Sequence, residues 1–207
     1  KVIYNGIDIA YTKQKDKKIN KLFKGNGRLK IGMLSRIEPY KGHENLVNVI
    51  NELPIKFKRK LMVYFIGLGQ PKYVDKLKIK IKKFDLNSYF KFTGYIDEDS
   101  PIILKRLDLL LSLTKDFEGF GLSVAESFLA NTPVLATKVG GITEFLNDKN
   151  SILIKPNNQK ELKLSLIKFV KNPMKYKKKS MVGKKIIYEK FNSEKMAQNF
   201  KFFFDEC

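Results

Sequence analysis

The chain has 207 residues but only one cysteine, one histidine and no tryptophan. The single cysteine, Cys207, excludes an intramolecular disulfide, so nothing points to a disulfide-stapled secreted scaffold. One cysteine with one histidine also excludes the usual zinc and iron–sulfur centres. No apolar run approaches the roughly 20 residues that a membrane-spanning helix needs. With 43% hydrophobic residues, the chain is expected to be globular and to bury an ordinary core.

Acidic residues are also scarce. The chain has 41 Lys and Arg against 21 Asp and Glu, which gives a formal net charge of +20. Such an excess is typical of proteins that bind nucleic acid or anionic membranes. Arginine, the preferred bidentate ligand of phosphate and guanine, occurs only four times. A general bias toward lysine explains the excess equally well, so the charge alone identifies no partner.

From residue 29 onward, short apolar segments alternate with segments of helical periodicity. Six segments have the length and composition of buried strands: 29–35, 61–66, 89–93, 109–113, 134–137 and 152–154. Helices are predicted over 42–53, 71–81, 100–107, 122–130, 142–146, 162–170, 174–188 and 193–204. Buried strands that alternate with helices require a mostly parallel sheet covered on both faces. We therefore predict an α/β fold, a Rossmann-like doubly wound sheet of about six strands.

The first 28 residues do not follow this pattern. Residues 1–6 have the form of a short strand that enters an Asn-Gly turn. Residues 8–30 are polar, rich in lysine and interrupted by glycine, which is typical of a linker or an exposed excursion. Because residue 1 is lysine and no signal-like region follows, our hypothesis is that the chain is a piece of a longer protein.

Ligands of doubly wound sheets bind beyond the carboxyl ends of the strands. One loop at this edge, Gly67-Leu68-Gly69, begins like a dinucleotide fingerprint. Lys72 occupies the third glycine position, so a plain strand-to-helix turn is the better interpretation. The acidic run at 97–99 precedes Ser100 and Pro101, which favours a helix cap over a metal site. His43 lies in the first turn of a predicted helix, where a solvated or capping role is expected.

The loop 114–121 carries the most specific pattern. Glu118-Gly119-Phe120-Gly121-Leu122 leads directly into a helix, and Glu126 follows with seven residues between the two acids. The glycines let a ligand approach the backbone, and the helix N-terminus favours an anion such as phosphate. Glu118 and Glu126 are too far apart for an acid pair and would hold two separate parts of one ligand. Taken singly, each is better explained as an acid that stabilises the helix.

Two cations follow the first predicted strand. Arg36 comes directly after it, and Lys41 precedes Gly42, where the first helix opens. Both charges would project above the carboxyl edge of the sheet, where they could hold a diphosphate. For most of the other lysines, a solvated surface is the better interpretation.

Together these motifs resemble the C-terminal half of a retaining GT-B glycosyltransferase of family 4, the "group 1" set. The resemblance covers nearly the whole chain and rests on the order of several motifs: Asn5-Gly6-Ile7-Asp8, Ser35-Arg36, Lys41-Gly42, Phe92-Thr93-Gly94-Tyr95, Glu118 to Glu126, Pro133-Val134, Gly140-Gly141 and Glu144. It departs from the family pattern at Ser35, Leu113-Thr114 and Asn131, none of which removes a proposed ligand contact. Asn131 replaces a glycine but tolerates the left-handed conformation that ends a helix.

The resemblance implies the roles of individual residues. Arg36 and Lys41 would neutralise the diphosphate, and Glu118 would contact the transferred sugar, so these three are the expected catalytic residues. Glu126 would bind the ribose hydroxyls. The remaining donor-binding residues would be Gly119, Phe120, Gly121 and Leu122 at the phosphate and sugar, Gly94, Tyr95 and Ile96 beside the base, and Gly6. No metal or cofactor is expected, so protein cations and the helix N-terminus would stabilise the leaving group.

The resemblance also implies a division of the chain. Residues 1–28 would be an inter-domain hinge and lysine-rich linker, and residues 29–190 the nucleotide-sugar donor domain. Residues 191–207 would form a helix that returns to an N-terminal domain absent from this chain. Phe200, Phe203 and Phe204 are spaced as one apolar stripe for such a contact. The alternative is that these rings cover the sheet of this domain.

The implied function is transfer of a hexose or N-acetylhexosamine with retention, with UDP-sugar as the favoured donor. The acceptor would be a glycan or a lipid-linked molecule in the assembly of cell-surface polysaccharide, lipopolysaccharide or glycoprotein glycans. The fragment alone would bind donor and be inactive. Two alternatives stay open: another sugar-nucleotide or sugar-phosphate enzyme of epimerase or phosphorylase type, and a basic nucleic-acid module, although no nucleic-acid partner is expected. An epimerase would need the full glycine fingerprint, and a nucleic-acid module would bind with strong salt dependence.

The charge is unevenly distributed. From Leu111 to Lys155, the stretch with the acidic motif, four lysines oppose five acids. Residues 171–185 instead carry seven lysines and no acid. We expect a cytoplasmic protein, and a basic outer surface of this kind could hold it peripherally at an anionic membrane.

Overall fold

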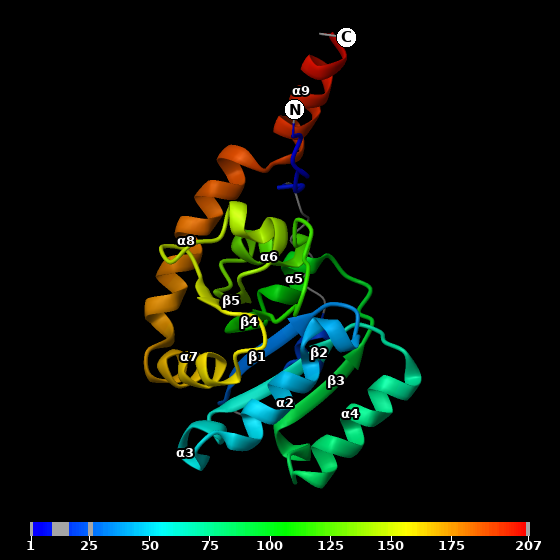
Figure 1. The fold of residues 1–207 in the computed structure, drawn as a ribbon, viewed down its shortest axis with the longest axis vertical. Helices are drawn as coiled ribbons and strands as arrows, with labels where there is room; N and C mark the ends of the chain where they lie inside the picture. Colours follow the sequence, from blue (N-terminus) through cyan, green and yellow to red (C-terminus); the bar gives the residue numbers. More distant parts are fainter. Residues whose placement is uncertain (1, 10–16, 25–26, 206–207) are drawn as a thin grey trace.

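The computed structural model describes residues 2–9, 17–24 and 27–205. In these ranges it contains one sheet of six parallel strands in the order β3-β2-β1-β4-β5-β6 (Figure 1). The strands are β1 (Leu29–Leu34), β2 (Leu61–Ile66), β3 (Phe90–Gly94), β4 (Leu109–Ser112), β5 (Val134–Thr137) and β6 (Ile152–Ile154). This order is that of a doubly wound sheet, so the predicted fold is confirmed. Each of the six strands predicted from residue 29 onward lies within one residue of its expected bounds.

One face of the sheet is covered by α2 (His43–Glu52), α4 (Pro71–Lys83) and α7 (Gln159–Lys171). The short helix α3 (Ile55–Lys58) connects α2 to β2. Leu46, Leu77 and Leu166 from the three covering helices are fully buried against side chains of the strands, such as Ile31 and Val63. Each such side chain contributes about 1.5–3 kcal/mol by leaving water.

The other face is covered by α1 (Lys17–Leu22), α5 (Ser100–Leu104) and α6 (Leu122–Leu129). Their buried residues pack against alternate strand residues, including Tyr64 and Leu110. Gly32 in β1 points to this side, and a Cβ there would lie 2.8 Å from a methyl carbon of Leu107. Both faces are therefore filled, as a parallel sheet requires.

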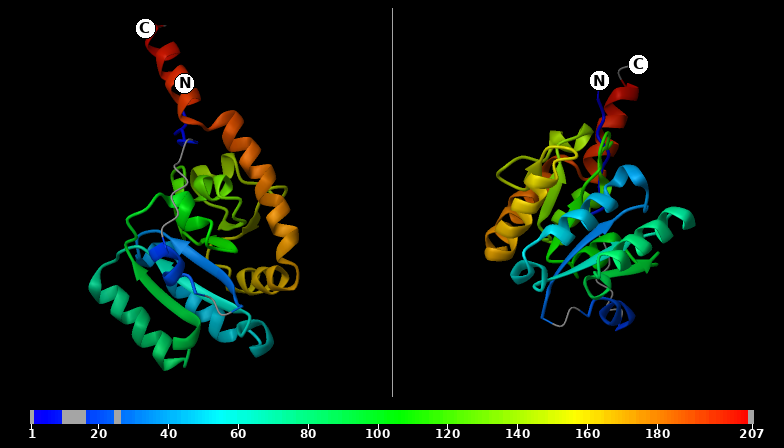
Figure 2. Two further views of the ribbon diagram at one scale, coloured as in Figure 1. Left: turned by 180° about the vertical axis from the view of Figure 1, so that it is seen from behind. Right: turned by 60° about the horizontal axis from the view of Figure 1, so that its bottom comes forward.

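Helix α8 (Pro173–Lys190) crosses the β6 edge of the sheet and joins the two cores. Tyr176, near its start, belongs to the core of the first face, and Ile187, near its end, to that of the second. Gly183 lets α8 approach α6, because a Cβ there would overlap the ring of Phe128. Figures 1 and 2 show α8 running along this flank of the molecule.

Helix α9 (Ser193–Asp205) projects away from the sheet (Figures 1 and 2). None of its residues, all of which are described, is buried. Phe200, Phe203 and Phe204 are 44%, 38% and 68% exposed, and their rings contact one another. The alternative in which this stripe covers the sheet of this domain is therefore wrong.

The N-terminal predictions need correction. Residues 2–9 contain no strand; Ile7 makes a single parallel bridge to Asn192 before α9. The exposed excursion predicted over 8–30 is wrong at Ile19 and Phe23, which are 1% and 3% exposed. The Phe23 ring lies 4.9 Å from that of Tyr64. Residues 10–16 and 25–26, also part of that prediction, lie outside the described residues.

Smaller differences concern helix ends. Three short 3-10 helices occur in the described chain: η1 (Pro39–Lys41), η2 (Asn87–Tyr89) and η3 (Gly140–Glu144), the last where a helical turn was predicted. Helix α5 ends at Leu104 rather than residue 107. Asp99 occupies its N-cap position, but no described side chain caps it by a hydrogen bond. Asn131 has φ +55°, so the predicted left-handed residue after α6 is confirmed.

Candidate functional site

The two central strands, β1 and β4, are neighbours, with Ile31 paired to Leu109. From β1 the chain proceeds toward β2 on one side, and from β4 toward β5 on the other. The loops that leave the carboxyl ends of these strands therefore diverge and open a crevice, which is where doubly wound folds bind ligands. The two loops are residues 35–42 and 113–121, the same segments that carry the cationic and acidic motifs.

The loop after β1 is fastened to the loop after β4. The backbone N–H of Lys115 donates to the carbonyl of Tyr40 over 2.8 Å. Gly42 has φ +84°, and a Cβ there would overlap the carbonyl of Leu113. Only glycine adopts this conformation and spacing without strain. The tight 3-10 turn η1 and Gly42 thus deliver Lys41 to the crevice; α2 begins one residue later than predicted, at His43.

Lys41 and Glu118 meet in this crevice. The ammonium nitrogen Nζ of Lys41 lies 2.7 Å from Oε2 of Glu118, and their side chains are 16% and 17% exposed. Oε2 also accepts a hydrogen bond of 2.7 Å from the hydroxyl of Thr114. Thr114, which is 1% exposed, was not among the predicted site residues. The sequence could have indicated Thr114 by its position just after β4, in the loop that carries the acidic motif.

The backbone of Glu118 is held by the loop after β5. The N–H of Gly141 donates to the carbonyl of Glu118 over 2.9 Å. Gly140 has φ +56°, and a Cβ there would overlap the same carbonyl oxygen. Behind this layer, the hydroxyl of Thr137 donates over 2.5 Å to the carbonyl of Thr114. Three loops therefore position the Glu118 carboxylate.

Helix α6 begins beside this carboxylate. Its N-cap is Gly121, with φ +74°, and no described side chain caps it. The first N–H groups of a helix have no partner within the helix, so they present positive charge to the crevice. A Cβ at Gly119 would have no described atom within 4 Å, so a ligand can approach the backbone there. Leu122 is 53% exposed at the same place.

Phe120 differs from its neighbours. Its ring lies 5.2 Å from that of Phe145 and 5.5 Å from that of Phe191, so the side chain belongs to the second core. The ring is half-buried in these contacts, so we expect a donor to meet mainly the backbone at this position.

Glu126 lies one turn into α6 and faces α5. Burial raises the pKa of its carboxyl, the hydroxyl of Ser100 lowers it by a hydrogen bond, and the charge of Asp99 raises it further. The net shift is upward. The loop after β3 leads to the same place: Gly94 has φ +70°, Tyr95 is 70% exposed, and Ile96 packs against the second core.

Arg36 stands at the outer rim. Its side chain is 73% exposed, pairs with Glu38 at 3.2 Å and donates to the hydroxyl of Tyr40 over 2.9 Å. The Tyr40 ring also lies 5.1 Å from Nζ of Lys41. Arg36 does not contact Glu118 in this structure, so the two predicted cations occupy different depths of the crevice.

Gly6 lies elsewhere. A Cβ there would be 2.6 Å from the carbonyl oxygen of Asn192, and its N–H donates to Sδ of Met196 over 3.1 Å. The structure thus places Gly6 where the N-terminal segment meets α9, and it shows no contact between Gly6 and the Lys41–Glu118 pair. The nearby Tyr4 donates to Glu144, which raises the pKa of the tyrosine.

The role predicted for His43 from the sequence is wrong. It is fully buried rather than solvated, and its ring packs edge-on against Phe65 at 4.9 Å. Burial lowers the pKa of its imidazole to about 4; the Glu38 backbone opposes the shift and the Lys41 charge adds to it. His43 is therefore neutral near pH 7, directly beneath the cationic loop.

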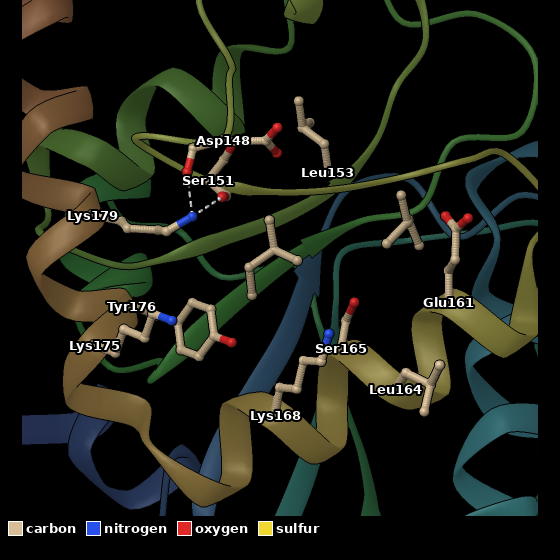
Figure 3. A pocket seen from close by; sticks show the side chains of 12 residues that line it. Asp148, Ser151, Leu153, Glu161, Leu164, Ser165, Lys168, Lys175, Tyr176 and Lys179 are labelled. Atoms are coloured by element: carbon tan, nitrogen blue, oxygen red, sulfur yellow. Dashed lines mark hydrogen bonds between the residues drawn. The ribbon is translucent and has the colours of Figure 1, made fainter.

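Other features of the described chain lie away from the crevice. No three His, Cys, Asp or Glu side chains are grouped to hold a metal ion within residues 2–9, 17–24 and 27–205. No helix in those ranges is long and apolar enough to cross a membrane. A cavity of about 370 Å³ lies between β6, α7 and α8 (Figure 3). It is on the β6 flank and includes none of the predicted site residues.

A family model described as "Glycosyl transferases group 1" matches residues 14–186. The chain belongs to this family. It is 29% identical over 208 residues to an uncharacterised glycosyltransferase of Methanocaldococcus jannaschii, covering 99% of this chain and 52% of that protein. It is 27% identical to a poly(ribitol-phosphate) alpha-N-acetylglucosaminyltransferase of Staphylococcus aureus, covering 81% of this chain and 34% of that protein.

Solved structures agree with this assignment. The Anabaena protein HepE in complex with UDP-glucose has a TM-score of 0.87 and 26% identity, with 100% of this chain and 57% of that chain covered. The C-terminal domain of a group 1 family protein from Francisella tularensis has a TM-score of 0.76 and 21% identity, with 91% and 100% covered. The glycosyltransferase chain thus has the GT-B Rossmann-like fold, and it spans about half the length of two glycosyltransferases of Methanocaldococcus jannaschii that it resembles, 52% of one and 53% of the other.

Proposed function

We propose that this chain is the donor-binding half of a glycosyltransferase that uses a nucleoside diphosphate sugar, with UDP-sugar favoured. The observation that carries the proposal is the Lys41–Glu118 pair, held in the crevice between β1 and β4 beside the uncapped N-terminus of α6. A diphosphate needs cations and N–H donors, and a sugar needs a carboxylate and approachable backbone. The crevice offers these groups side by side.

The nucleotide would lie across the crevice with its diphosphate at Lys41 and the α6 N-terminus. Glu126, beyond the first turn of α6, would accept hydrogen bonds from the ribose hydroxyls, and the exposed ring of Tyr95 would flank the base. One similar structure is described as a complex with UDP-glucose, which supports the choice of a UDP-sugar as donor. Gly6 is the predicted donor residue with the least support, because it lies against Asn192.

The chemistry required of the site is stabilisation of a leaving diphosphate. When the bond between the anomeric carbon and the diphosphate oxygen breaks, negative charge grows on that oxygen. An acceptor hydroxyl oxygen bonds to the carbon, and its proton passes to the departing diphosphate. Lys41, Arg36 and the α6 N–H groups would hold the developing charge without a metal. Lys41 would move from the Glu118 carboxylate to the diphosphate, which frees Glu118 to contact the transferred sugar.

The whole enzyme would transfer a hexose or N-acetylhexosamine with retention to a glycan or lipid-linked acceptor. The acceptor would bind an N-terminal domain beyond this chain, and the exposed Phe200, Phe203 and Phe204 would dock there. The setting would be cytoplasmic assembly of cell-surface polysaccharide, lipopolysaccharide or glycoprotein glycans. Relatives named as transferases of glucose, mannose or N-acetylglucosamine support the choice of sugar class.

Calorimetric titration of the chain with UDP, GDP, ADP and their sugars tests the donor proposal. We expect UDP to bind most tightly and Glu126→Ala and Arg36→Ala to weaken it by about tenfold or more, since hydrogen bonds to charged groups contribute about 1.5–3 kcal/mol. Arg59→Ala and Glu189→Ala, exposed residues outside the crevice, are the matched controls. Failure of every nucleotide to bind, or equal losses in the controls, would contradict the proposal. Product NMR with the longer enzyme tests retention.

A further inference from the structure

The outer face of α8 differs from the rest of the surface in both charge and apolarity. The buried face of this helix is a single stripe of Tyr176, Ser180, Gly183 and Ile187, spaced by four, three and four residues. The opposite face is therefore defined by helical geometry, with its centre at Met174, Lys178, Met181 and Lys185. We call these four residues, with Val182 beside them, the outer α8 face.

Apolar side chains project from this face into solvent. Met174, Met181 and Val182 are 63%, 64% and 44% exposed. Met174 also lines a surface pocket together with Leu107 and Pro133. Both views in Figure 2 show α8 as the flank of the molecule rather than as a buried layer. Flexible methionine side chains that alternate with lysines along one stripe are suited to a surface that is apolar inside and anionic outside.

The charged residues of the segment that forms most of α8 are all basic. Residues 171–185 carry seven lysines and no acid. One of them, Lys179, has a structural role, because its ammonium donates to the carbonyls of Asp148 and Ser151 at the cavity beside β6 (Figure 3). Lys178 has no such role, and Lys185 is 76% exposed, with only a 3.7 Å i,i+4 contact to Glu189.

The other lysine-rich helix provides the comparison. Helix α4 contains six lysines, but Lys76 and Lys80 both pair with Glu44, and Lys78 pairs with Asp75. Its exposed apolar residue, Ile79, stands among charges that are partly neutralised. Each helix thus has one exposed 3.7 Å pair, Lys78–Asp75 on α4 and Lys185–Glu189 on α8, but α4 also has the two closer pairs to Glu44. A high lysine content alone therefore does not create the combination found on α8, where lysines with few acidic partners stand beside exposed methionines.

We propose that the outer α8 face lies on an anionic lipid bilayer, with Met174, Met181 and Val182 at the level of the headgroups and the surrounding lysines against the lipid phosphates. The contact would be peripheral and reversible, because the apolar area is small and most of the attraction is electrostatic. It would place the β6 flank of the domain against the membrane. It is independent of donor binding, since the outer α8 face shares no residue with the crevice.

Vesicle sedimentation tests this with the 207-residue chain. We expect binding to vesicles with roughly one third anionic phosphatidylglycerol, little binding to pure phosphatidylcholine, and loss of binding as salt rises. Each adsorbed lysine contributes about fivefold to the partition coefficient. The double variant Lys178→Glu/Lys185→Glu should therefore bind at least tenfold more weakly and keep the UDP affinity of the wild type. The matched control is Lys82→Glu/Lys83→Glu on α4, which makes the same change in net charge.

A second measurement tests the apolar contact. An environment-sensitive fluorophore on Met181→Cys, in a chain with Cys207→Ser, should shift to shorter wavelength when anionic vesicles are added. The same fluorophore on Ile79→Cys should not shift. Equal losses in the two lysine pairs, equal binding to neutral vesicles, or no shift at position 181 would each overturn the proposal. The proposal would also be overturned if the Lys178→Glu/Lys185→Glu variant lost binding to single-stranded RNA but bound vesicles as the wild type does.

Discussion

Nζ of Lys41 lies 2.7 Å from Oε2 of Glu118, although 77 residues separate the two along the chain. The pair occupies the point where the two halves of the sheet diverge, and Thr114 donates to the same carboxylate oxygen. An ammonium that is held by a carboxylate must exchange partners when a diphosphate arrives. The pair therefore sets both where a donor binds and what its binding must displace.

Substitutions of the two partners should have opposite effects on nucleotide affinity. Lys41→Ala removes the cation and is expected to weaken UDP binding by about tenfold or more. Glu118→Gln keeps the shape but removes the charge that competes for Lys41, so UDP should bind equally or more tightly. Calorimetry on both variants, with circular dichroism to check the fold, measures this. If both lose affinity alike, Lys41 does not exchange partners.

Alanine substitutions at Gly121 and Gly119 should separate effects on stability from effects on donor binding. Gly121 has φ +74°, and a Cβ there would lie 2.5 Å from Cγ2 of Ile142, so Gly121→Ala should destabilise the chain by about 1–3 kcal/mol. A Cβ on Gly119 would enter open space, so Gly119→Ala should change stability by less than about 0.5 kcal/mol. Urea unfolding measures both values.

Gly119→Ala should nevertheless weaken UDP-sugar binding, because its methyl group would occupy the space where the donor approaches the backbone. A variant of normal stability and normal affinity would show that the donor does not reach Gly119. For Gly121→Ala, the control for backbone strain is Gly27→Ala, because Gly27 has φ +78° and no described atom lies within 4 Å of its Cβ position.

His43 should make the fold sensitive to acid. Its pKa falls from 6.5 to about 4 on folding, so the folded state resists protonation that the unfolded chain accepts. Stability is therefore full above about pH 6.5 and is lost as the pH falls toward 4, by about 3 kcal/mol for a shift of this size. Denaturant unfolding from pH 7 to 4.5 measures the slope.

His43→Leu removes this titration and keeps an apolar side chain against Phe65. The variant should lose less stability than the wild type between pH 6.5 and 4.5. Parallel curves for the two proteins would mean that other groups cause the acid sensitivity. Lowering the pH acts on the carboxylates of both proteins alike, so the difference between the curves reports the imidazole.

Much of the fold could be predicted from local pattern. Strands such as Leu61–Ile66 are continuous apolar runs between turn residues. A run of that kind is typical of a strand in a parallel sheet with both faces covered. The loops at the carboxyl edge of the sheet could be predicted to bind the ligand, because their positions follow from the strands that precede them. Helix α1 was missed because a short lysine-rich segment has little periodicity, and the burial of Ile19 and Phe23 depends on a sheet face that is formed far away in sequence.

The candidate site divides in the same way. The sequence by itself determined the six strands, the glycine turns and the residues at the sheet edge, because these follow from local periodicity, backbone sterics and motif order. Only the tertiary structure decided that Lys41 is bound to Glu118, that Thr114 shares that carboxylate, that His43 is buried, and that the outer α8 face and the α9 phenylalanines remain exposed. Those outcomes depend on which loops pack against each other and which helix faces are covered. Both are set by contacts between residues that lie far apart in the sequence, so local sequence patterns do not predict them.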